Sequence, residues 1–519
     1  MRGGMSADTT EERDPDYKTV LDEPLGPAFD ESSTAPRTYH ITRRVFMTML
    51  GAIFAIAFAS LGGQITGLIG SEGILPAQAF LDDVAEGYGP ERYRLLPTVG
   101  WLNASDDALT KYCIIGFVCA LLAMSGVLVR VMLLTCWALY LSLFHLGRDF
   151  LGFQWDVLLL ETAFLAMFLA PGRLFPRMAE EDRVPMAPLW LLRCLLFRLM
   201  FASGNVKLDD QTWRELNALS VHYETQPLPT TLAWYAHQLP AWFQQFSVVT
   251  MFAIELIIPF FIFLPRTYRV IGCAIMIAFQ FFIILTGNYC FFNWLAIALC
   301  VLLLDDDHWQ AMLPERLKQF IQLPEGLKPP GRIRRGLGIA FAVSMILLSI
   351  VPMSRLLSTE PEWLEPLRQV HRQTAPFALV NGYGLFAHMT VVRPEIDIEG
   401  SADGETWLPY RFKWKPGPLD ARPRQVAPHQ PRLDWQMWFA ALSPEPQPAW
   451  FNGLLFRLLQ GEPSVTALFA HNPFPDEPPK FVRAVYYQYA FTDLETRQET
   501  GQWWNRSKIG LYRPSVSLR

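Results

Sequence analysis

Nine long apolar stretches constrain what this chain can fold into more than any other feature of its sequence. A helix that crosses a membrane needs about 20 mostly apolar residues, and these stretches reach or approach that length. They cover residues 45–63, 112–129, 131–146, 155–170, 189–204, 246–264, 268–285, 291–304 and 336–352. The third, fourth, fifth and eighth are short, so the sequence predicts a bundle of about seven to nine transmembrane helices.

The composition also indicates a membrane protein. Of the 519 residues, 51% are apolar and only 18% are charged, whereas about 25% are charged in a typical soluble protein. The seven cysteines all lie between Cys113 and Cys300, with no CxxC pair and no His/Cys cluster of metal-ligand spacing. We therefore expect buried structural thiols and no metal site. The chain has no nucleotide or hydrolase motif and no basic stripe, so we expect no cofactor and no nucleic-acid partner.

The positions of Lys and Arg predict an orientation, because short cytoplasmic loops carry an excess of basic residues. A cytoplasmic N-terminus places one set of basic residues in the cytoplasm: Arg43, Arg44, Arg130, Arg173, Arg177, Arg183, Arg266, Arg269, Lys328, Arg332, Arg334 and Arg335. The loops on the other side carry fewer basic residues over a greater length. Nine passes then place the C-terminal region on the lumenal or periplasmic side.

Three regions follow from these patterns. Residues 1–42 hold nine Asp or Glu against four Lys or Arg and few large apolar side chains, which predicts a disordered acidic cytoplasmic tail. Residues 43–352 form the transmembrane helical domain, with large non-cytoplasmic loops at 64–111 and 205–245. Residues 353–519 have a soluble composition and form a non-cytoplasmic domain.

Alternating residues predict that this last region is a β-rich, sandwich-like domain. Polar and apolar residues alternate over 395–399, a turn follows at 401–404, and alternation resumes over 410–415. This pattern is typical of a hairpin with one apolar and one solvated face. A further strand is expected over 485–491 and a helix near 435–442.

Five ionisable residues lie inside the apolar stretches: Asp156, Glu161, Arg193, Arg198 and Glu255. Charged side chains are costly in lipid, so these residues should face the bundle interior and have partners. They form either a polar site between helices or structural ion pairs between the fourth and fifth stretches.

Histidines offer two weaker hypotheses. His145, Arg148 and Asp149 have the spacing of one helical face and could form an acid-base group or a solvated helix end. His222 and His237 are fifteen residues apart in a proline-broken loop, which does not suit a zinc site.

Six strings resemble the lipase maturation factor family, and the resemblance extends from about Arg43 to Arg513. The strings are FASLGGQITGLIGSEGILPA, FQWDVLLLETAFLAMFLAP, WLLRCLLFRLMFASGNVKL, TWRELNALSVHYETQPLPTTLAWYAHQLP, PFALVNGYGLFAHMTVVRPEI and VAPHQPRLDWQMWFAAL. The resemblance implies a multi-pass membrane protein that assists the folding and assembly of secreted lipases without a known enzymatic reaction. It implies the endoplasmic reticulum membrane in a eukaryote, and in a bacterium we expect the plasma membrane.

A factor of this kind has to contact an incompletely folded client, a secreted lipase or another exported protein, as well as membrane lipids. Aromatic side chains suit that contact, although they also pack inside domains and at headgroup level. The aromatic candidates for client binding are Trp234, Trp242, Trp435, Trp438 and Phe439.

A second hypothesis is enzymatic. The segment FASGNVKLDDQTW also resembles part of the vitamin K-dependent carboxylase family, over about a dozen residues. That resemblance implies an intramembrane enzyme acting on a lipid or secreted protein, with Lys207 as base or nucleophile. Alternatively, Lys207 extends to the membrane interface. A transporter is disfavoured because the two halves show no internal repeat.

Overall fold

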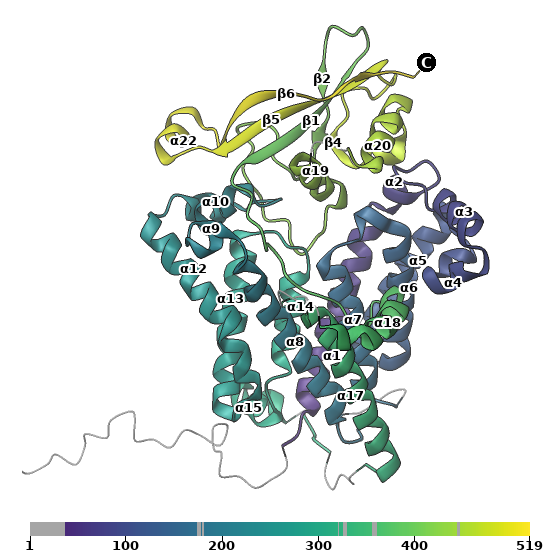
Figure 1. Ribbon diagram of the computed structural model, residues 1–519, viewed down its shortest axis with the longest axis vertical. Helices are drawn as coiled ribbons and strands as arrows, with labels where there is room; N and C mark the ends of the chain where they lie inside the picture. The colour runs from purple at the N-terminus through teal and green to yellow at the C-terminus, as the bar shows by residue number, and fades with distance from the viewer. Residues whose placement is uncertain are drawn as a thin grey trace, which may run out of the picture.

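A tall helical bundle carries a sheet-containing domain at one end, and α1 begins at the opposite end (Figure 1). The computed structural model describes residues 37–173, 178, 181–319, 321–324, 330–354, 356, 361–443 and 447–518. Residues 1–36 of the predicted acidic tail lie outside the described residues, as do Arg177 and Lys328. Residues 40–42, which the sequence places in the tail, form the first turn of α1.

Each of the nine apolar stretches contains a helix. These helices are α1 (His40–Gly62), α5 (Asp106–Ser125), α6 (Val129–Gly147), α7 (Gln154–Leu169), α8 (Met186–Lys207), α12 (Ala241–Leu256), α13 (Arg266–Thr286), α14 (Phe292–Val301) and α17 (Arg332–Ser354). Within the described chain, seven are long and apolar enough to cross a membrane, and α7 and α14 are the two shorter ones. The predicted fold class of a mainly helical multi-pass bundle is confirmed.

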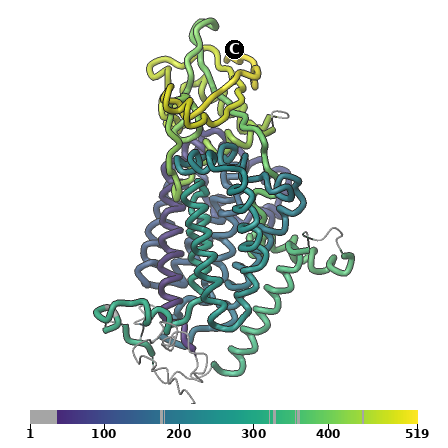
Figure 2. Tube along the Cα trace, turned by 90° about the vertical axis from the view of Figure 1, so that its left-hand side faces the viewer, coloured from purple at the N-terminus to yellow at the C-terminus, as the bar shows by residue number. Residues whose placement is uncertain are grey.

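The two short helices lie inside the bundle. Every residue of α14 except Trp294 is buried, and most of α7 is buried as well. Because neighbouring helices surround them, these two helices need not match the thickness of the hydrocarbon core. By contrast α17 is mostly exposed and stands apart at the edge of the bundle (Figure 2).

Short helices cover the end of the bundle that carries the sheet domain. The predicted loop 64–111 contains α2 (Ile65–Ile69), α3 (Ala77–Tyr88) and α4 (Arg92–Leu95). The predicted loop 205–245 contains α9 (Gln211–Arg214), α10 (Ala218–Thr225) and α11 (Thr231–His237). At the opposite end lie α15 (Asp306–Met312) and α16 (Glu315–Lys318), and α18 (Glu365–Thr374) lies beside the bundle.

The C-terminal region is β-rich, as predicted, and has two antiparallel sheets. The larger sheet has the order β2-β1-β5-β6, and β3 and β4 form the smaller one. The strands are β1 (Arg393–Ser401), β2 (Leu408–Pro409), β3 (Arg411–Phe412), β4 (Phe469–His471), β5 (Phe481–Phe491) and β6 (Trp504–Val516). Two helices, α19 (Arg432–Leu442) and α20 (Ala449–Gln460), pack on the larger sheet, while α21 (Pro463–Thr466) and α22 (Leu494–Thr500) are short.

The predicted hairpin is wrong in its second strand. The segment after β1 pairs with β1 only through Leu408 and Pro409 of β2. Arg411 and Phe412 then join the smaller sheet.

The expected solvated face is also wrong, because Glu395 is 1% exposed and Asp397 is 7% exposed. Glu395 pairs with Arg393 of the same strand and with Lys415, and Asp397 pairs with Arg506. Alternation within one strand does not reveal the partners that come from other segments.

The proposed helical face of His145, Arg148 and Asp149 is wrong as well. Helix α6 ends at Gly147, and Arg148 has a positive φ of 43°. The residues beyond Gly147 therefore leave the helical path. His145 Nε2 lies 2.7 Å from the carbonyl oxygen of Pro376, and the Arg148 guanidinium lies over the ring of Phe80.

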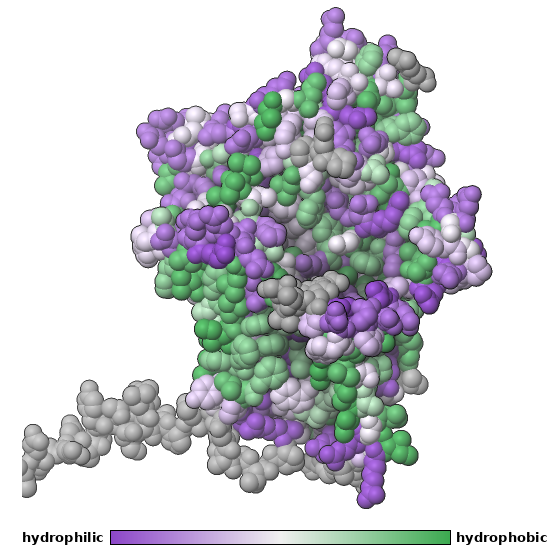
Figure 3. Space-filling model, in the orientation of Figure 1, coloured by the Kyte–Doolittle hydropathy of each residue, from purple (hydrophilic) through white to green (hydrophobic). Residues whose placement is uncertain are grey.

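The surface supports a membrane position for the bundle. Figure 3 shows apolar side chains gathered on the flank of the bundle, with hydrophilic residues at its two ends and over the sheet domain. Two of the exposed side chains on this flank are Phe246 on α12 and Phe282 on α13, at 62% and 67%. An apolar surface of this extent needs lipid or protein around it.

Candidate functional site

The charged residues inside the bundle fall into separate centres rather than one cluster. Asp156 pairs with Arg432, Glu161 pairs with Arg198, and Glu255 pairs with Lys207. Only the second of these is a pair between α7 and α8, as the alternative of structural ion pairs expects. Asp156 and Glu255 instead pair with Arg432 and Lys207, which are not among the five ionisable residues of the apolar stretches.

The pair of Asp156 and Arg432 joins the bundle to the C-terminal domain. Arg432 Nη1 donates to Asp156 Oδ2 at 2.7 Å, and Nη2 donates to Oδ1 at 2.8 Å. The Tyr140 hydroxyl donates to Asp156 Oδ1 at 2.6 Å, and the carbonyl oxygen of Phe150 accepts from Nη1 at 3.0 Å. Both charged side chains are 0–1% exposed. Among the described residues only the Arg432 Nε–H of this pair has no hydrogen-bond partner. Bidentate geometry and several hydrogen bonds help a buried pair to offset its desolvation.

Glu161 lies at a second junction with the segment that precedes the sheet. It pairs with Arg198, and its Oε2 accepts from the Tyr383 hydroxyl at 2.7 Å and from the Asn381 backbone N–H at 2.9 Å. Several donors thus converge on one carboxylate.

Arg193 has no carboxylate partner in the described chain, and instead donates twice to the carbonyl oxygen of Leu302 at 2.8–2.9 Å.

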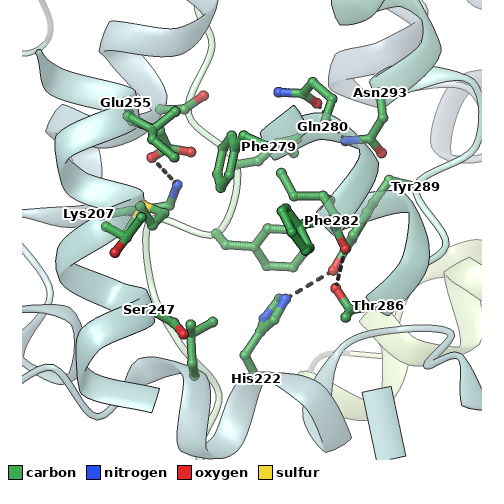
Figure 4. Close-up of a pocket in the computed structure, with 18 of the residues that line it drawn as sticks. Lys207, His222, Ser247, Glu255, Phe279, Gln280, Phe282, Thr286, Tyr289 and Asn293 are labelled. Carbon is green, nitrogen blue, oxygen red and sulfur yellow. Dashed lines mark hydrogen bonds and ion pairs between the residues drawn. The ribbon is translucent and has the colours of Figure 1, made fainter. Parts of the chain in front are cut away.

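The third centre borders a cavity. Lys207 Nζ lies 2.5 Å from Glu255 Oε2, and both side chains are 7% exposed. The ammonium also lies 5.3 Å from the ring centroid of Trp213. Figure 4 shows this pair on one side of the cavity, with Gln280 and Asn293 opposite.

The cavity has a volume of about 540 Å³ and is mainly apolar. This volume lies within the ~300–1,000 Å³ range of small-molecule sites. Its walls come from α8 to α14 and from the segment that contains Leu385 and Phe386. The apolar lining residues include Leu199, Met200, Leu239, Phe243, Phe246, Met251, Ile254, Ile275, Phe279, Phe282, Ile283, Phe292, Leu385 and Phe386.

A hydrogen-bonded chain forms a further part of the wall. The Tyr289 hydroxyl donates to Gln226 Oε1 at 2.8 Å and lies 3.0 Å from His222 Nε2. Burial, and secondarily the charge of Lys207, lower the pKa of His222 to about 4. His222 is therefore neutral at pH 7 and adds no charge to the cavity.

The aromatic candidates for client binding divide into buried and exposed residues. Trp234, Trp435 and Trp438 are 1%, 3% and 8% exposed, whereas Trp242 and Phe439 are 67% and 41% exposed. The ring of Trp435 packs 4.8 Å from that of Trp155, and Trp438 Nε1 donates to the carbonyl oxygen of Thr225 at 2.8 Å. Only the two exposed residues present their side chains to a partner.

Several of the residues that build these centres carry no signal in the sequence. Arg432 lies in the C-terminal domain, 276 residues from its partner Asp156. Tyr289 lies between α13 and α14, and Asn293 lies within α14. No local sequence pattern marks either residue.

His237, the other loop histidine, lies 3.9 Å from Glu224. No three His, Cys, Asp or Glu residues in the described ranges are placed to hold a metal ion.

Comparison with known proteins places both halves of the chain in one family. The profile of the lipase maturation factor transmembrane domain matches residues 41–311, and that of the lipase maturation factor C-terminal domain matches residues 379–514. Lipase maturation factor 2 of Gallus gallus is 36% identical over 92% of this chain and 81% of its own length. Lipase maturation factor 1 of Homo sapiens is 32% identical over 95% and 91%. No solved structure matches the chain.

Proposed function

This chain belongs to the lipase maturation factor family, and from that premise we propose that it assists the folding and assembly of secreted lipases in a chaperone-like role. The observation that carries the proposal is the attachment of the C-terminal domain to the bundle through the buried pair of Asp156 and Arg432. A rigid extramembrane platform follows from this attachment. It would hold a client beside the membrane without covalent chemistry.

The proposed orientation puts the N-terminus in the cytoplasm and the C-terminal domain on the lumenal or periplasmic side. Helices α1, α6, α13 and α17 all begin at the end of the bundle opposite the sheet domain (Figure 1). Basic residues stand at or near those four helix starts: Arg43, Arg44, Arg130, Arg266, Arg269, Arg332, Arg334 and Arg335. This asymmetry supports a cytoplasmic location for that end. The membrane is that of the endoplasmic reticulum in a eukaryote or the plasma membrane in a bacterium.

Client contact would use apolar side chains that the platform leaves exposed. Ile509 and Leu511 are 55% and 52% exposed on β6, which is an edge strand of the larger sheet. Phe439 and Trp242 are the exposed members of the aromatic set. Exposed apolar groups of this kind suit transient contact with an incompletely folded protein.

The test is the activity of a secreted lipase co-expressed with the chain in cells that lack lipase maturation factors. Active secreted lipase should rise when the chain is present. The double variant Ile509→Asp with Leu511→Asp should lower lipase activity several-fold at unchanged abundance of the chain, because the sites are exposed and away from the core.

The matched control is Met312→Asp, which changes a side chain that is 60% exposed on α15, at the other end of the bundle. It should leave lipase activity unchanged. If the chain itself does not raise lipase activity, the proposed function is wrong. Equal loss in both variants would contradict the proposed client surface.

The carboxylase hypothesis finds no support in the family matches, which are to lipase maturation factors. Lys207, its candidate base, is held by Glu255 in the buried pair described above.

A further inference from the structure

The cavity beside Lys207 has a mouth that faces lipid. Leu239, Phe243, Phe246 and Phe282 line the cavity and are 36–67% exposed. They belong to the segment before α12, the first turns of α12 and the last turns of α13. The opening therefore lies between α12 and α13, on the apolar flank of the bundle near the sheet domain. A molecule dissolved in the bilayer reaches this opening without crossing water.

The size of the cavity suits one long acyl chain. A volume of about 540 Å³ holds at least roughly 18 groups of the size of a water molecule, at ~30 Å³ each. Methylene groups are of similar size, so one acyl chain of about that length fits inside.

The polar wall has hydrogen-bond donors to spare. The Lys207 ammonium has three N–H donors. Among the described residues, Glu255 is the one hydrogen-bond acceptor that it has. Gln280 Nε2 donates only to the sulfur of Met200, at 3.7 Å, while Gln280 Oε1 accepts from Asn293 at 2.7 Å. Thioether sulfur is a weak acceptor. A ligand oxygen that accepts hydrogen bonds would therefore use donors that the protein leaves underused.

The charges of the cavity already balance. The positive Lys207 is paired with the negative Glu255, and His222 is neutral at pH 7. An anionic ligand would bring an uncompensated charge into a site of low dielectric constant, which is costly. The balance favours a ligand without net charge.

We propose that the cavity binds a neutral single-chain lipid with an acceptor oxygen at its head, such as an acyl ester, which enters between α12 and α13. Its carbonyl oxygen accepts from Lys207, and its chain lies along Phe279, Phe282 and their apolar neighbours (Figure 4). This inference does not depend on the proposed function, because it concerns binding by the chain alone.

Three probes with the same 18-carbon chain test the proposal on the purified full chain in nanodiscs. They are methyl oleate, which is neutral with a carbonyl, sodium oleate, which is anionic, and (Z)-9-octadecene, which has no oxygen. Tritiated methyl oleate should bind at about one molecule per chain. Sodium oleate and octadecene should compete at least tenfold more weakly than unlabelled methyl oleate. Equal competition by all three probes, or stronger competition by oleate, would overturn the proposal.

Two neighbouring alanines on α13 provide a matched pair of variants. Ala278 lines the cavity, whereas Ala274, one turn earlier, does not. Ala278→Phe should reduce methyl oleate binding at least tenfold, and Ala274→Phe should leave it unchanged. Equal binding by the two variants would place the ligand elsewhere on the molecule and so contradict the proposal.

A double variant tests the polar wall without leaving a buried charge. Replacing both partners of a buried ion pair by apolar residues is often neutral for stability. Lys207→Met with Glu255→Leu should therefore fold, and it should bind octadecene within about twofold of methyl oleate. A double variant that folds and keeps the full preference for the ester would show that Lys207 takes no part in binding.

Discussion

Two buried ion pairs in the same bundle have different surroundings. Asp156 and Arg432 are enclosed by the Tyr140 hydroxyl and the carbonyl oxygen of Phe150, and both oxygens of the carboxylate are hydrogen bonded. Lys207 and Glu255 share one contact and stand at the wall of a cavity. A pair with many fixed hydrogen bonds holds two parts of a structure together. A pair with a single contact beside a cavity keeps donors for a ligand.

This difference predicts that Arg432→Met is the most destabilising of the charge changes. It leaves Asp156 as a buried charge without its cation, which costs ~3–5 kcal/mol of the free energy of unfolding. Denaturant unfolding of the purified protein in detergent measures the loss. Adding Asp156→Leu to the same chain should recover most of it. A loss below about 1 kcal/mol for the single variant would contradict a joining role for this pair.

The aromatic residues allow the same comparison between enclosed and open positions. Trp435 is 3% exposed and packs between Trp155 and Tyr289, so Trp435→Ala should cost about 3 kcal/mol through the cavity that it creates. Trp242 is 67% exposed, and Trp242→Ala should cost less than ~0.5 kcal/mol. Thermal unfolding of the two variants tests this. Similar midpoints would show that the packing around Trp435 does not stabilise the fold.

Lys207→Met should cost less than Arg432→Met. Lys207 donates to Glu255 alone among the described residues, whereas Arg432 donates to three different groups, so fewer groups lose a partner and we expect ~1–3 kcal/mol. The same unfolding experiment measures it. If the two single variants lose equal stability, the distinction between the enclosed pair and the cavity pair does not hold.

His222 should make stability depend on pH. Burial lowers its pKa in the folded protein to about 4, below the ~6.5 of an unfolded chain. Between these values the unfolded chain binds more protons, so stability falls as the pH falls from about 6.5 to about 4, by on the order of 3 kcal/mol. Unfolding measured across this range should show the slope, and His222→Gln should reduce it. An unchanged slope in that variant would assign the effect to other groups.

Much of the fold follows from local sequence. Runs of apolar residues predicted all nine helices of the bundle, because the length of a run and the thickness of a membrane are directly related. Alternation predicted the strand that became β5, and the helix near Trp435 is α19. The expected solvated face of β1 failed because Lys415, at 3.0 Å from Glu395, and Arg506, at 2.9 Å from Asp397, come from outside the strand.

The polar centres depend on contacts that no local pattern encodes. The apolar stretches showed that Asp156 needs a partner, but they could not identify Arg432, which lies beyond the last helix of the bundle. The cavity likewise combines side chains from seven helices, and its residues follow no motif. Sequence reasoning could find each charged residue, whereas only the folded chain shows which of them remain incompletely paired.

The side of the membrane on which the C-terminal domain lies is the central claim of the proposed function. A reporter that is active only outside the cytoplasm, fused after Arg519, measures it directly. The reporter should be active, and the same reporter fused after Arg130, at the opposite end of the bundle, should be silent. Activity of a cytoplasm-specific reporter after Arg519 would contradict the account, because the domain would then lie on the wrong side to meet a secreted lipase.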